Sequence, residues 1–365
     1  ELYIKVKACT PINEIEETYR RRATWKDSGF IRSCLPQIDN NQPTQSFMSK
    51  KLFITRFLPR GLLQPTTDAN YTVDMYEEDS QCPRDVLLSR SRGADALLVQ
   101  GTDVIDAQLL DLATRLKVIA CCSVGYDNVD IEAAQSRGII VCNAPSKDLI
   151  ATTAESAVAL LLSVAKRITR LHVGQLEGKL PPFSIFQTMG LPIRDRTCGI
   201  IGMGRIGGSI ARIMKSGFGN SILYFNRSAK TDLENSLGAQ RRALDELVAE
   251  SDFVFVVLPL TNSTRNLLNR RNLAFLKRGA IVINIARSGV IDDDALVRLL
   301  TEDRIFGAGL DVYGDALEKC DHPNLVLTAH MANAEKQAAE ATVEMAISNI
   351  VAVLSNGPPI SPVTT

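Results

Sequence analysis

The sequence predicts an α/β protein built from two doubly wound parallel-sheet domains. Apolar, strand-like runs alternate with helix-like stretches in two separate blocks of the chain, an order that is typical of parallel sheets covered by helices. The chain has 365 residues, 45% of them hydrophobic, which exceeds what a single hydrophobic core usually organises. We therefore expect two domains, each with its own sheet.

Residues 1–47 precede the first clean strand pattern and are expected to form an irregular N-terminal extension. They are polar, carry both signs of charge and begin without methionine. The arginines at positions 20–22 suggest a transit peptide, whereas the glutamates at 14, 16 and 17 argue against one.

The first alternating block predicts the first sheet. Its strand-like runs are followed by Pro145, which breaks the chain before a long helix expected over about 152–172 as a connector between domains. A loop rich in proline and glycine then covers 178–192. The five expected strands lie at 52–57, 71–76, 94–100, 116–122 and 138–143.

The second block predicts the second sheet, whose strands are apolar throughout, as is typical of strands with helices on both faces. Helices are expected at 245–249 and 292–300, and a last helix over about 334–354 would return to the first domain. We therefore expect a discontinuous domain made of 48–147 and 335–365, and a second domain over 148–334. The strands of the second block are expected at 221–226, 252–258, 279–285, 307–313 and 324–330.

Residues 197–214 combine a short apolar strand, a glycine turn and the start of an amphipathic helix. Gly202, Gly204 and Gly207 form G-x-G-x-x-G, in which the first glycine makes a tight turn, the second admits a pyrophosphate and the third lets helix pack on strand. The amides of Arg205 and Ile206 would point at the phosphates from the positive end of the helix dipole. This pattern predicts a Rossmann dinucleotide-binding domain, and a glycine turn that serves packing alone is the alternative.

Composition excludes some partners and favours one compartment. Lysine plus arginine equals aspartate plus glutamate at 41 each, so we expect no nucleic acid and no membrane surface as a partner. The longest apolar run, 157–165, is far too short to cross a bilayer and predicts a buried helix. The 8 cysteines show no C-x-x-C spacing, which favours reduced thiols in the cytoplasm, and we expect no metal.

An ordered series of motifs resembles the D-isomer-specific 2-hydroxyacid dehydrogenases, and glyoxylate/hydroxypyruvate reductases above all. The resemblance covers about 52–359. It implies a flavodoxin-like, discontinuous substrate domain beside the Rossmann cofactor domain, a small 2-ketoacid substrate, and a homodimer formed through the cofactor domain. The motifs are SVGYDNVD (123–130), TTAE (152–155), GIIGMGRIG (199–207), LPLTNSTR (258–265), INIARSGVIDDDAL (283–296), GAGLDVY (307–313) and DHPNLVLTAH (321–330).

The resemblance implies the catalytic residues, and their chemistry suits ketoacid reduction. Arg287 matches the arginine of the family, whose guanidinium can grip a carboxylate or carbonyl through paired hydrogen bonds. Val124 and Gly125 match the backbone pair that binds the substrate carboxylate, and His330 matches the acid/base that delivers a proton as hydride reaches C2. The alternatives are a solvated loop arginine and an ordinary structural histidine.

Further positions are implied at the cofactor. Asp311 matches the residue that accepts from the nicotinamide carboxamide, and Thr153 matches one near the nicotinamide. The alternatives are a strand-end aspartate that caps a loop and a threonine that caps a helix N-terminus. The remaining cofactor-binding positions are Leu258, Pro259 and Ile285, whereas His172 and His322 are expected to be structural.

The end of the second strand in the cofactor domain predicts the choice of dinucleotide. An NAD enzyme carries a carboxylate there for the ribose hydroxyls, but this chain reads Phe225, Asn226, Arg227, Ser228. Arg227 and Ser228 could hold a 2′-phosphate, so we expect NADPH, with NADH possible. An ordinary basic loop is the alternative.

One departure from the family pattern concerns the partner of the histidine. The catalytic glutamate of the family lies five residues after the position of Asp311, and Ala316 stands there. Asp315 and Glu318 could substitute for it or be solvated loop charges, and Ala329 replaces the proline before the histidine. Two rival functions follow: a dinucleotide-sensing, corepressor-like interaction protein with weakened turnover, and a formate-dehydrogenase-like enzyme that needs no proton transfer.

Overall fold

The structure is a computed structural model that describes residues 49–180, 186 and 188–363. The predicted extension over 1–47 and most of the predicted proline-rich segment at 181–187 lie outside the described residues.

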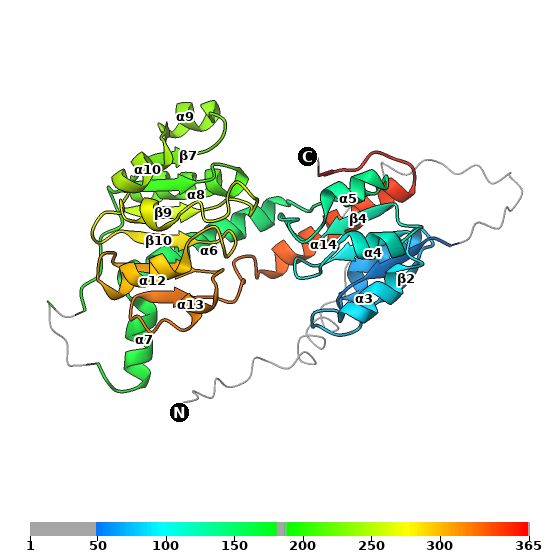
Figure 1. Cartoon of the computed structure of the whole chain (residues 1–365), viewed down its shortest axis with the longest axis horizontal. Helices are drawn as coiled ribbons and strands as arrows, with labels where there is room; N and C mark the ends of the chain where they lie inside the picture. The colour runs from blue at the N-terminus through cyan, green and yellow to red at the C-terminus, as the bar shows by residue number, and fades with distance from the viewer. Residues whose placement is uncertain (1–48, 181–185, 187, 364–365) are drawn as a thin grey trace, which may run out of the picture. The chain divides into compact units, whose positions relative to one another are not determined.

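The first sheet has five parallel strands in the order β2-β1-β3-β4-β5. Two of them, β2 and β4, are labelled in Figure 1. Alternate strand residues enter two apolar clusters: Leu52 and Ile54 of β1 pack on one face, and Phe53 packs on the other. All five expected strands are present, with bounds Lys51–Ile54 (β1), Thr72–Met75 (β2), Ala96–Val99 (β3), Val118–Cys121 (β4) and Ile140–Cys142 (β5). The helical elements of this block are η1 (Arg60–Leu63), α2 (Gln64–Asp68), α3 (Arg84–Ser91), α4 (Ala107–Leu112) and α5 (Ile131–Ser136).

The second sheet has seven parallel strands in the order β12-β11-β10-β9-β6-β7-β8. From the interior strand β6 the chain first builds outward through β7 and β8, and then on the other side through β9 to β12. A ligand crevice is expected at the carboxyl ends of the strands where the order reverses, beside β6. The bounds are Thr197–Ile201 (β6), Ser221–Phe225 (β7), Gln240–Arg241 (β8), Phe253–Val256 (β9), Ile281–Asn284 (β10), Gly307–Leu310 (β11) and Leu325–Leu327 (β12).

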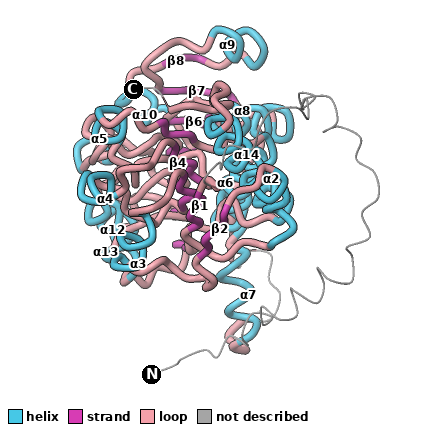
Figure 2. Tube along the Cα trace, turned by 90° about the vertical axis from the view of Figure 1, so that its right-hand side faces the viewer, coloured by secondary structure: helices cyan, strands magenta, loops and turns pink. Residues whose placement is uncertain are grey.

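Helices flank the strands on both sides (Figure 2). On the second sheet, one apolar cluster gathers residues of α6 and α8, and another gathers residues of α10, α11 and α12. The bounds are Lys147–Lys166 (α6), Arg205–Phe218 (α8), Thr231–Leu237 (α9), Leu244–Glu250 (α10), Arg270–Leu273 (α11), Asp293–Thr301 (α12) and Asp315–Glu318 (α13). The two-residue strand β8 was not predicted, because both of its residues are polar and exposed.

The helix expected over 152–172 is two helices, α6 and α7 (Ile168–Leu176), so that prediction was wrong. The break lies at Arg167, which adopts a left-handed conformation with φ 57° and ends α6. Its guanidinium lies 4.9 Å from the centre of the Phe306 ring, a tertiary contact that no helical periodicity reveals. By length and composition α6 would be long enough to cross a membrane, but half of its apolar window is buried, and the helix packs on α8 and β11.

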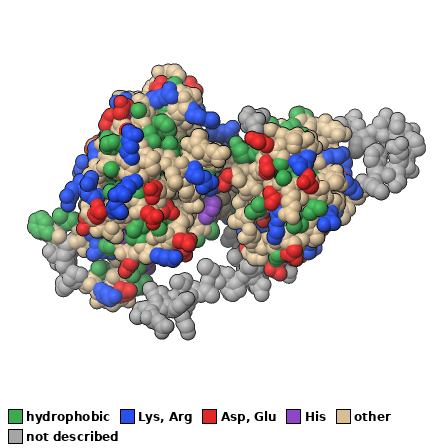
Figure 3. Space-filling model, viewed as in Figure 1, with side chains coloured by type: hydrophobic (Ala, Val, Ile, Leu, Met, Phe, Trp, Pro, Cys, Tyr) green, Lys and Arg blue, Asp and Glu red, His purple; other side chains and the backbone are tan. Residues whose placement is uncertain are grey.

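The last helix, α14 (Lys336–Leu354), packs on the first sheet. Its residues Val343, Ala346 and Ile347 share an apolar cluster with Leu52 and Ile54 of β1. The boundaries proposed between the two domains remain a prediction. Lysine and arginine are interspersed with aspartate and glutamate on the face shown in Figure 3, as the balanced composition leads one to expect.

Candidate active site

The glycine turn after β6 has the geometry that a dinucleotide phosphate requires. Gly202 has φ +104°, and a Cβ on it would lie 2.3 Å from the carbonyl oxygen of Val257. A Cβ on Gly207 would lie 2.2 Å from the carbonyl oxygen of Gly202, so neither position accepts a side chain. Around Gly204, the N-cap of α8, a Cβ would meet nothing within 4 Å. The helix N-terminus is therefore open to a phosphate group, and the residues present fit a dinucleotide.

A cavity of about 750 Å³ borders this turn. Arg205, Arg212 and Lys230 line it with one acidic side chain, Asp232. Arg205 and Ile206 lie in the first turn of α8, where backbone amides have no acceptor within the helix. Three cations and these amides favour an anionic ligand.

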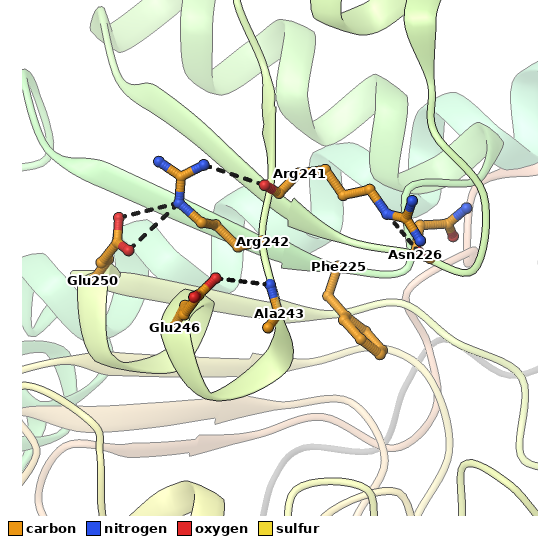
Figure 4. A pocket seen from close by; sticks show the side chains of 7 residues that line it. All are labelled: Phe225, Asn226, Arg241, Arg242, Ala243, Glu246 and Glu250. Carbon is orange, nitrogen blue, oxygen red and sulfur yellow. Dashed lines mark hydrogen bonds and ion pairs between the residues drawn. The ribbon is translucent and has the colours of Figure 1, made fainter.

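A second cavity, of about 580 Å³, lies at the carboxyl end of β7 (Figure 4). Asn226 donates to the carbonyl oxygen of Ser228 at 3.0 Å and so shapes the turn after β7. The Arg241 side chain runs to this turn, where its guanidinium donates to the carbonyl oxygens of Asn226 at 3.2 Å and Arg227 at 2.7 Å. Arg227 and Ser228 are exposed. The turn thus carries cations and no carboxylate.

The acidic residues of this second cavity have partners of their own. Glu246 accepts from the amide of Ala243 at 3.1 Å, and Glu250 pairs with Arg242 at 3.4 Å (Figure 4). Sequence reasoning missed Arg241, because its contact with the turn exists only through the pairing of β7 with β8.

Three further cofactor positions lie at the carboxyl ends of central strands. Leu258 follows β9. A Cβ on Gly202 would lie 2.9 Å from its side chain, so Leu258 borders the glycine turn. The carbonyl oxygen of Pro259 accepts from Thr264, and Ile285 is buried directly after β10.

Thr153 is buried in the second turn of α6, where its hydroxyl donates to the carbonyl oxygen of Leu149 at 2.7 Å. The cap of α6 is Ser146, whose hydroxyl accepts from the amide of Leu149. The alternative that Thr153 caps the helix was therefore wrong.

Arg287 follows β10 in a turn held by a buried amide side chain. Asn284 donates to the carbonyl oxygens of Arg287 and of Val312, both at 3.2 Å, and accepts from the amide of Ala286 at 3.0 Å. Asn284 therefore fixes the turn and ties it to the end of β11. Sequence reasoning missed this residue, although a single polar side chain at the end of an apolar strand was the available signal.

The structure brings Arg287 onto the loop that carries Val124 and Gly125. A Cβ on Gly125 would lie 2.0 Å from Nη2 of Arg287. The guanidinium also pairs with Asp127 of the same loop, with Nη2 at 2.9 Å from its carboxylate. The carbonyl oxygens of Val124 and Gly125 accept from Asn143 and Ser123, whereas their amides donate to no described residue. The guanidinium therefore lies against the loop whose two amides are free.

His330 stands on a strained loop held by Asp311. Its φ is 55°, and its amide donates to the carbonyl oxygen of Asp311 at 2.9 Å. The buried carboxylate of Asp311 accepts from the hydroxyl of Thr328 at 2.6 Å and from the amides of Met331 at 2.8 Å and Ala332 at 3.0 Å. Asp311 thus caps this loop, whereas its contact with nicotinamide remains a prediction.

The imidazole of His330 is exposed, and no described residue forms a hydrogen bond or ion pair with it. Ala316 is half-buried in α13. Asp315 and Glu318 of the same helix are exposed, and neither pairs with His330 in the part of the chain that the structure describes. Neither carboxylate substitutes for the glutamate of the family in this structure.

The other two histidines lie in different surroundings. Nδ1 of His322 accepts from the amide of Asn324 at 3.3 Å, and burial, aided by Arg170 and Arg167, lowers the pKa of this imidazole. His172 lies on α7. Within residues 49–180, 186 and 188–363, no three His, Cys, Asp or Glu side chains gather as metal ligands.

The sequence is similar to those of known proteins over most of its length. A family profile described as "D-isomer specific 2-hydroxyacid dehydrogenase, NAD binding domain" matches residues 158–332. A glyoxylate reductase from Thermococcus kodakarensis is 38% identical over 313 residues, which cover 84% of this chain and 93% of that protein.

Two crystal structures are similar over most of their length. One, of a protein from Thermus thermophilus, has a TM-score of 0.79 and 37% identity over 86% of this chain and 100% of that one. The other is an NADPH-dependent glyoxylate/hydroxypyruvate reductase from Sinorhizobium meliloti in complex with NADP and malonate. It has a TM-score of 0.74 and 27% identity over 87% of this chain and 97% of that one.

Proposed function

Because this chain belongs to the D-isomer-specific 2-hydroxyacid dehydrogenase family and is an oxidoreductase with a nicotinamide dinucleotide cofactor, we propose that it reduces glyoxylate, hydroxypyruvate or a similar small 2-ketoacid with NADPH. The product is the D-2-hydroxyacid. The observation that carries the proposal is the meeting of the Arg287 guanidinium with the free amides of Val124 and Gly125, since a 2-ketoacid presents a carboxylate next to its reactive carbonyl.

Each of these residues has a separate role in the proposed reaction. The dinucleotide, when bound, supplies the hydride that reaches C2. Arg287 and the two amides hold the substrate carboxylate, which orients the carbonyl. His330 donates a proton to the carbonyl oxygen from an imidazole that is exposed and engaged by no described residue.

NADPH oxidation across a panel of small 2-ketoacids tests the reaction. We expect turnover by the wild type, a loss of roughly a hundred to ten-thousandfold in kcat for His330→Ala, and a higher KM for the ketoacid in Arg287→Ala. Arg270→Ala, at an exposed arginine to which no role is assigned, is the control and should behave as wild type. NADPH binding without turnover of any ketoacid would instead favour the dinucleotide-sensing function.

The preference for NADPH is proposed from the turn after β7. Arg227 and Ser228 are available for a 2′-phosphate, and Arg241 adds a cation while holding the turn. Arg227→Ala should weaken NADPH binding by about ten to a hundredfold and leave NADH binding unchanged. The exposed Arg270→Ala serves as control. Equal affinity of the wild type for NADH and NADPH would contradict the proposal.

We also propose a homodimer whose interface includes α7 and Phe186. No residue of α7 is buried, and Leu176 and Phe186 are 74% and 81% exposed. Leu176→Asp should halve the mass measured by light scattering, and a monomer mass for the wild type at micromolar concentration would refute the dimer.

We place the enzyme in the cytoplasm, supported by six described cysteines that are all free thiols. Cell fractionation tests this location.

A further inference from the structure

We propose that Asp127 is a positioning residue for the reaction: its carboxylate holds Arg287 so that a pair of guanidinium N–H groups stays free for the carboxylate of the substrate. The inference rests on the proposed function and assigns a role to a residue that the family resemblance left without one.

A guanidinium has five N–H donors, and Arg287 donates hydrogen bonds through two of its nitrogens, Nε and Nη1. Nε lies 3.0 and 3.1 Å from the two carboxylate oxygens of Asp127, and Nη2 lies 2.9 Å from one of them. Nη1 donates to the carbonyl oxygen of Ala286 at 2.8 Å. Nη2 is ion-paired with Asp127 but donates no hydrogen bond to a described residue, so both terminal nitrogens keep N–H groups for another acceptor.

The N–H groups on the two terminal nitrogens suit a second carboxylate. Each terminal nitrogen of a guanidinium carries two N–H groups, and the carbonyl oxygen of Ala286 takes only one of the pair on Nη1. Two N–H groups on neighbouring nitrogens of one planar group can bind a carboxylate bidentately. Asp127 thus leaves Arg287 with an unused pair of donors.

The terminal N–H donors of Arg287 lie against the loop that carries the amides of Val124 and Gly125. Nη2 would lie 2.0 Å from a Cβ on Gly125, so the terminal nitrogen packs directly on the backbone of the loop. Val124 and Gly125 have amides that donate to no described residue. The same loop therefore supplies two substrate-binding amides and, through Asp127, the orientation of the arginine.

Charge alone predicts the opposite effect, which makes the inference testable. Asp127 is negative and lies beside a site for an anion, so its removal should strengthen anion binding if only electrostatics acted. The side chains of Arg287 and Asp127 are 25% and 32% exposed, which lets solvent screen that repulsion. A freed arginine side chain would regain rotamer freedom that binding must then remove. Positioning therefore predicts weaker binding.

The first experiment is steady-state kinetics on Asp127→Asn with Asp130→Asn as matched control. Asp130 lies in the same sequence motif and caps α5 by accepting from the amide of Ala133 at 2.9 Å. Asparagine caps a helix equally well, so the control loses the same charge and keeps the helix.

We expect the KM for the 2-ketoacid to rise about tenfold or more in Asp127→Asn, because one charged pair is lost. The KM for NADPH should stay unchanged and kcat should fall less. Asp127→Glu should recover part of the loss, and Asp130→Asn should match the wild type. An unchanged or lower KM for the ketoacid in Asp127→Asn would overturn the inference.

The second experiment separates this inference from the proposed function. Oxalate, a small dicarboxylate that cannot be reduced by hydride transfer in this way, is titrated calorimetrically into each protein with and without NADPH. Weaker oxalate binding to Asp127→Asn supports positioning even if no ketoacid is turned over. Equal or tighter binding overturns it, as does a wild type that binds no oxalate or an Arg287→Ala variant that binds it normally.

Discussion

Replacing Asp311 with asparagine should loosen the loop that carries His330. Asp311 is 2% exposed and its carboxylate accepts three hydrogen bonds, from the hydroxyl of Thr328 and the amides of Met331 and Ala332. Asparagine offers one acceptor oxygen. If that oxygen keeps the partners Thr328 and Met331, the new amide group faces the N–H of Ala332, which is buried and has no other acceptor.

The cost follows from these contacts. One charge-assisted hydrogen bond is lost, two are weakened and a buried donor is left unpaired, which together should destabilise the protein by about 2 to 4 kcal/mol. For domains of this size, a change of that magnitude lowers the unfolding midpoint by roughly 5 to 15 °C. The kcat should fall as well, because the positive φ of His330 persists only while its loop is held.

Thermal unfolding followed by circular dichroism measures the effect, with Asp315→Asn as control. Asp315 is exposed and close in sequence, so its amide variant should unfold with the wild type. An Asp311→Asn variant with the midpoint and kcat of the wild type would refute the reasoning, since it would show that these hydrogen bonds do not hold the loop.

Three further predictions address the turn, the core and the missing carboxylate. Gly207→Ala forces a Cβ to 2.2 Å from the backbone oxygen of Gly202, so it should destabilise the protein by about 1 to 3 kcal/mol and weaken NADPH binding in a fluorescence titration. Burial raises the pKa of the Asp103 carboxyl above its ordinary 3.8. The protonated carboxyl therefore adds to the free energy of unfolding below about pH 3.8, and this contribution is lost as the pH rises through the pKa of the folded state. Asp103→Asn should therefore gain stability relative to wild type between acidic and neutral pH, and parallel melting profiles would contradict this. Ala316→Glu should raise kcat by supplying a partner for His330, and an equal rise in a His330→Ala background would show that the effect does not pass through the imidazole.

Local patterns in the chain were enough to predict the class of fold and the turn that receives the dinucleotide. The strand-like runs of both blocks appear as parallel strands, because short, uninterrupted apolar runs suit strands that are covered on both faces. The spacing of Gly202, Gly204 and Gly207 similarly required a turn that only glycine can make, as the contacts of a Cβ at 202 and 207 demonstrate. Backbone sterics act within a few residues, so sequence patterns report them.

The end of α6 depended on contacts that local patterns do not contain. The apolar periodicity of α6 continues past its end, but the chain turns at Arg167, whose guanidinium lies over the ring of Phe306. The two residues are far apart in sequence, and neither identifies the other.

The arrangement around Arg287 was likewise decided only when the chain folded. Asp127 and Arg287 are 160 positions apart, and their pairing requires loops after β4 and β10 to meet. Asn284 and Arg241 are polar side chains bonded to backbone groups, and the sequence does not identify which backbone groups these are. The partners of Arg287 determine which of its N–H donors are occupied and which are left for a substrate. Those partners are brought to it only when the chain folds.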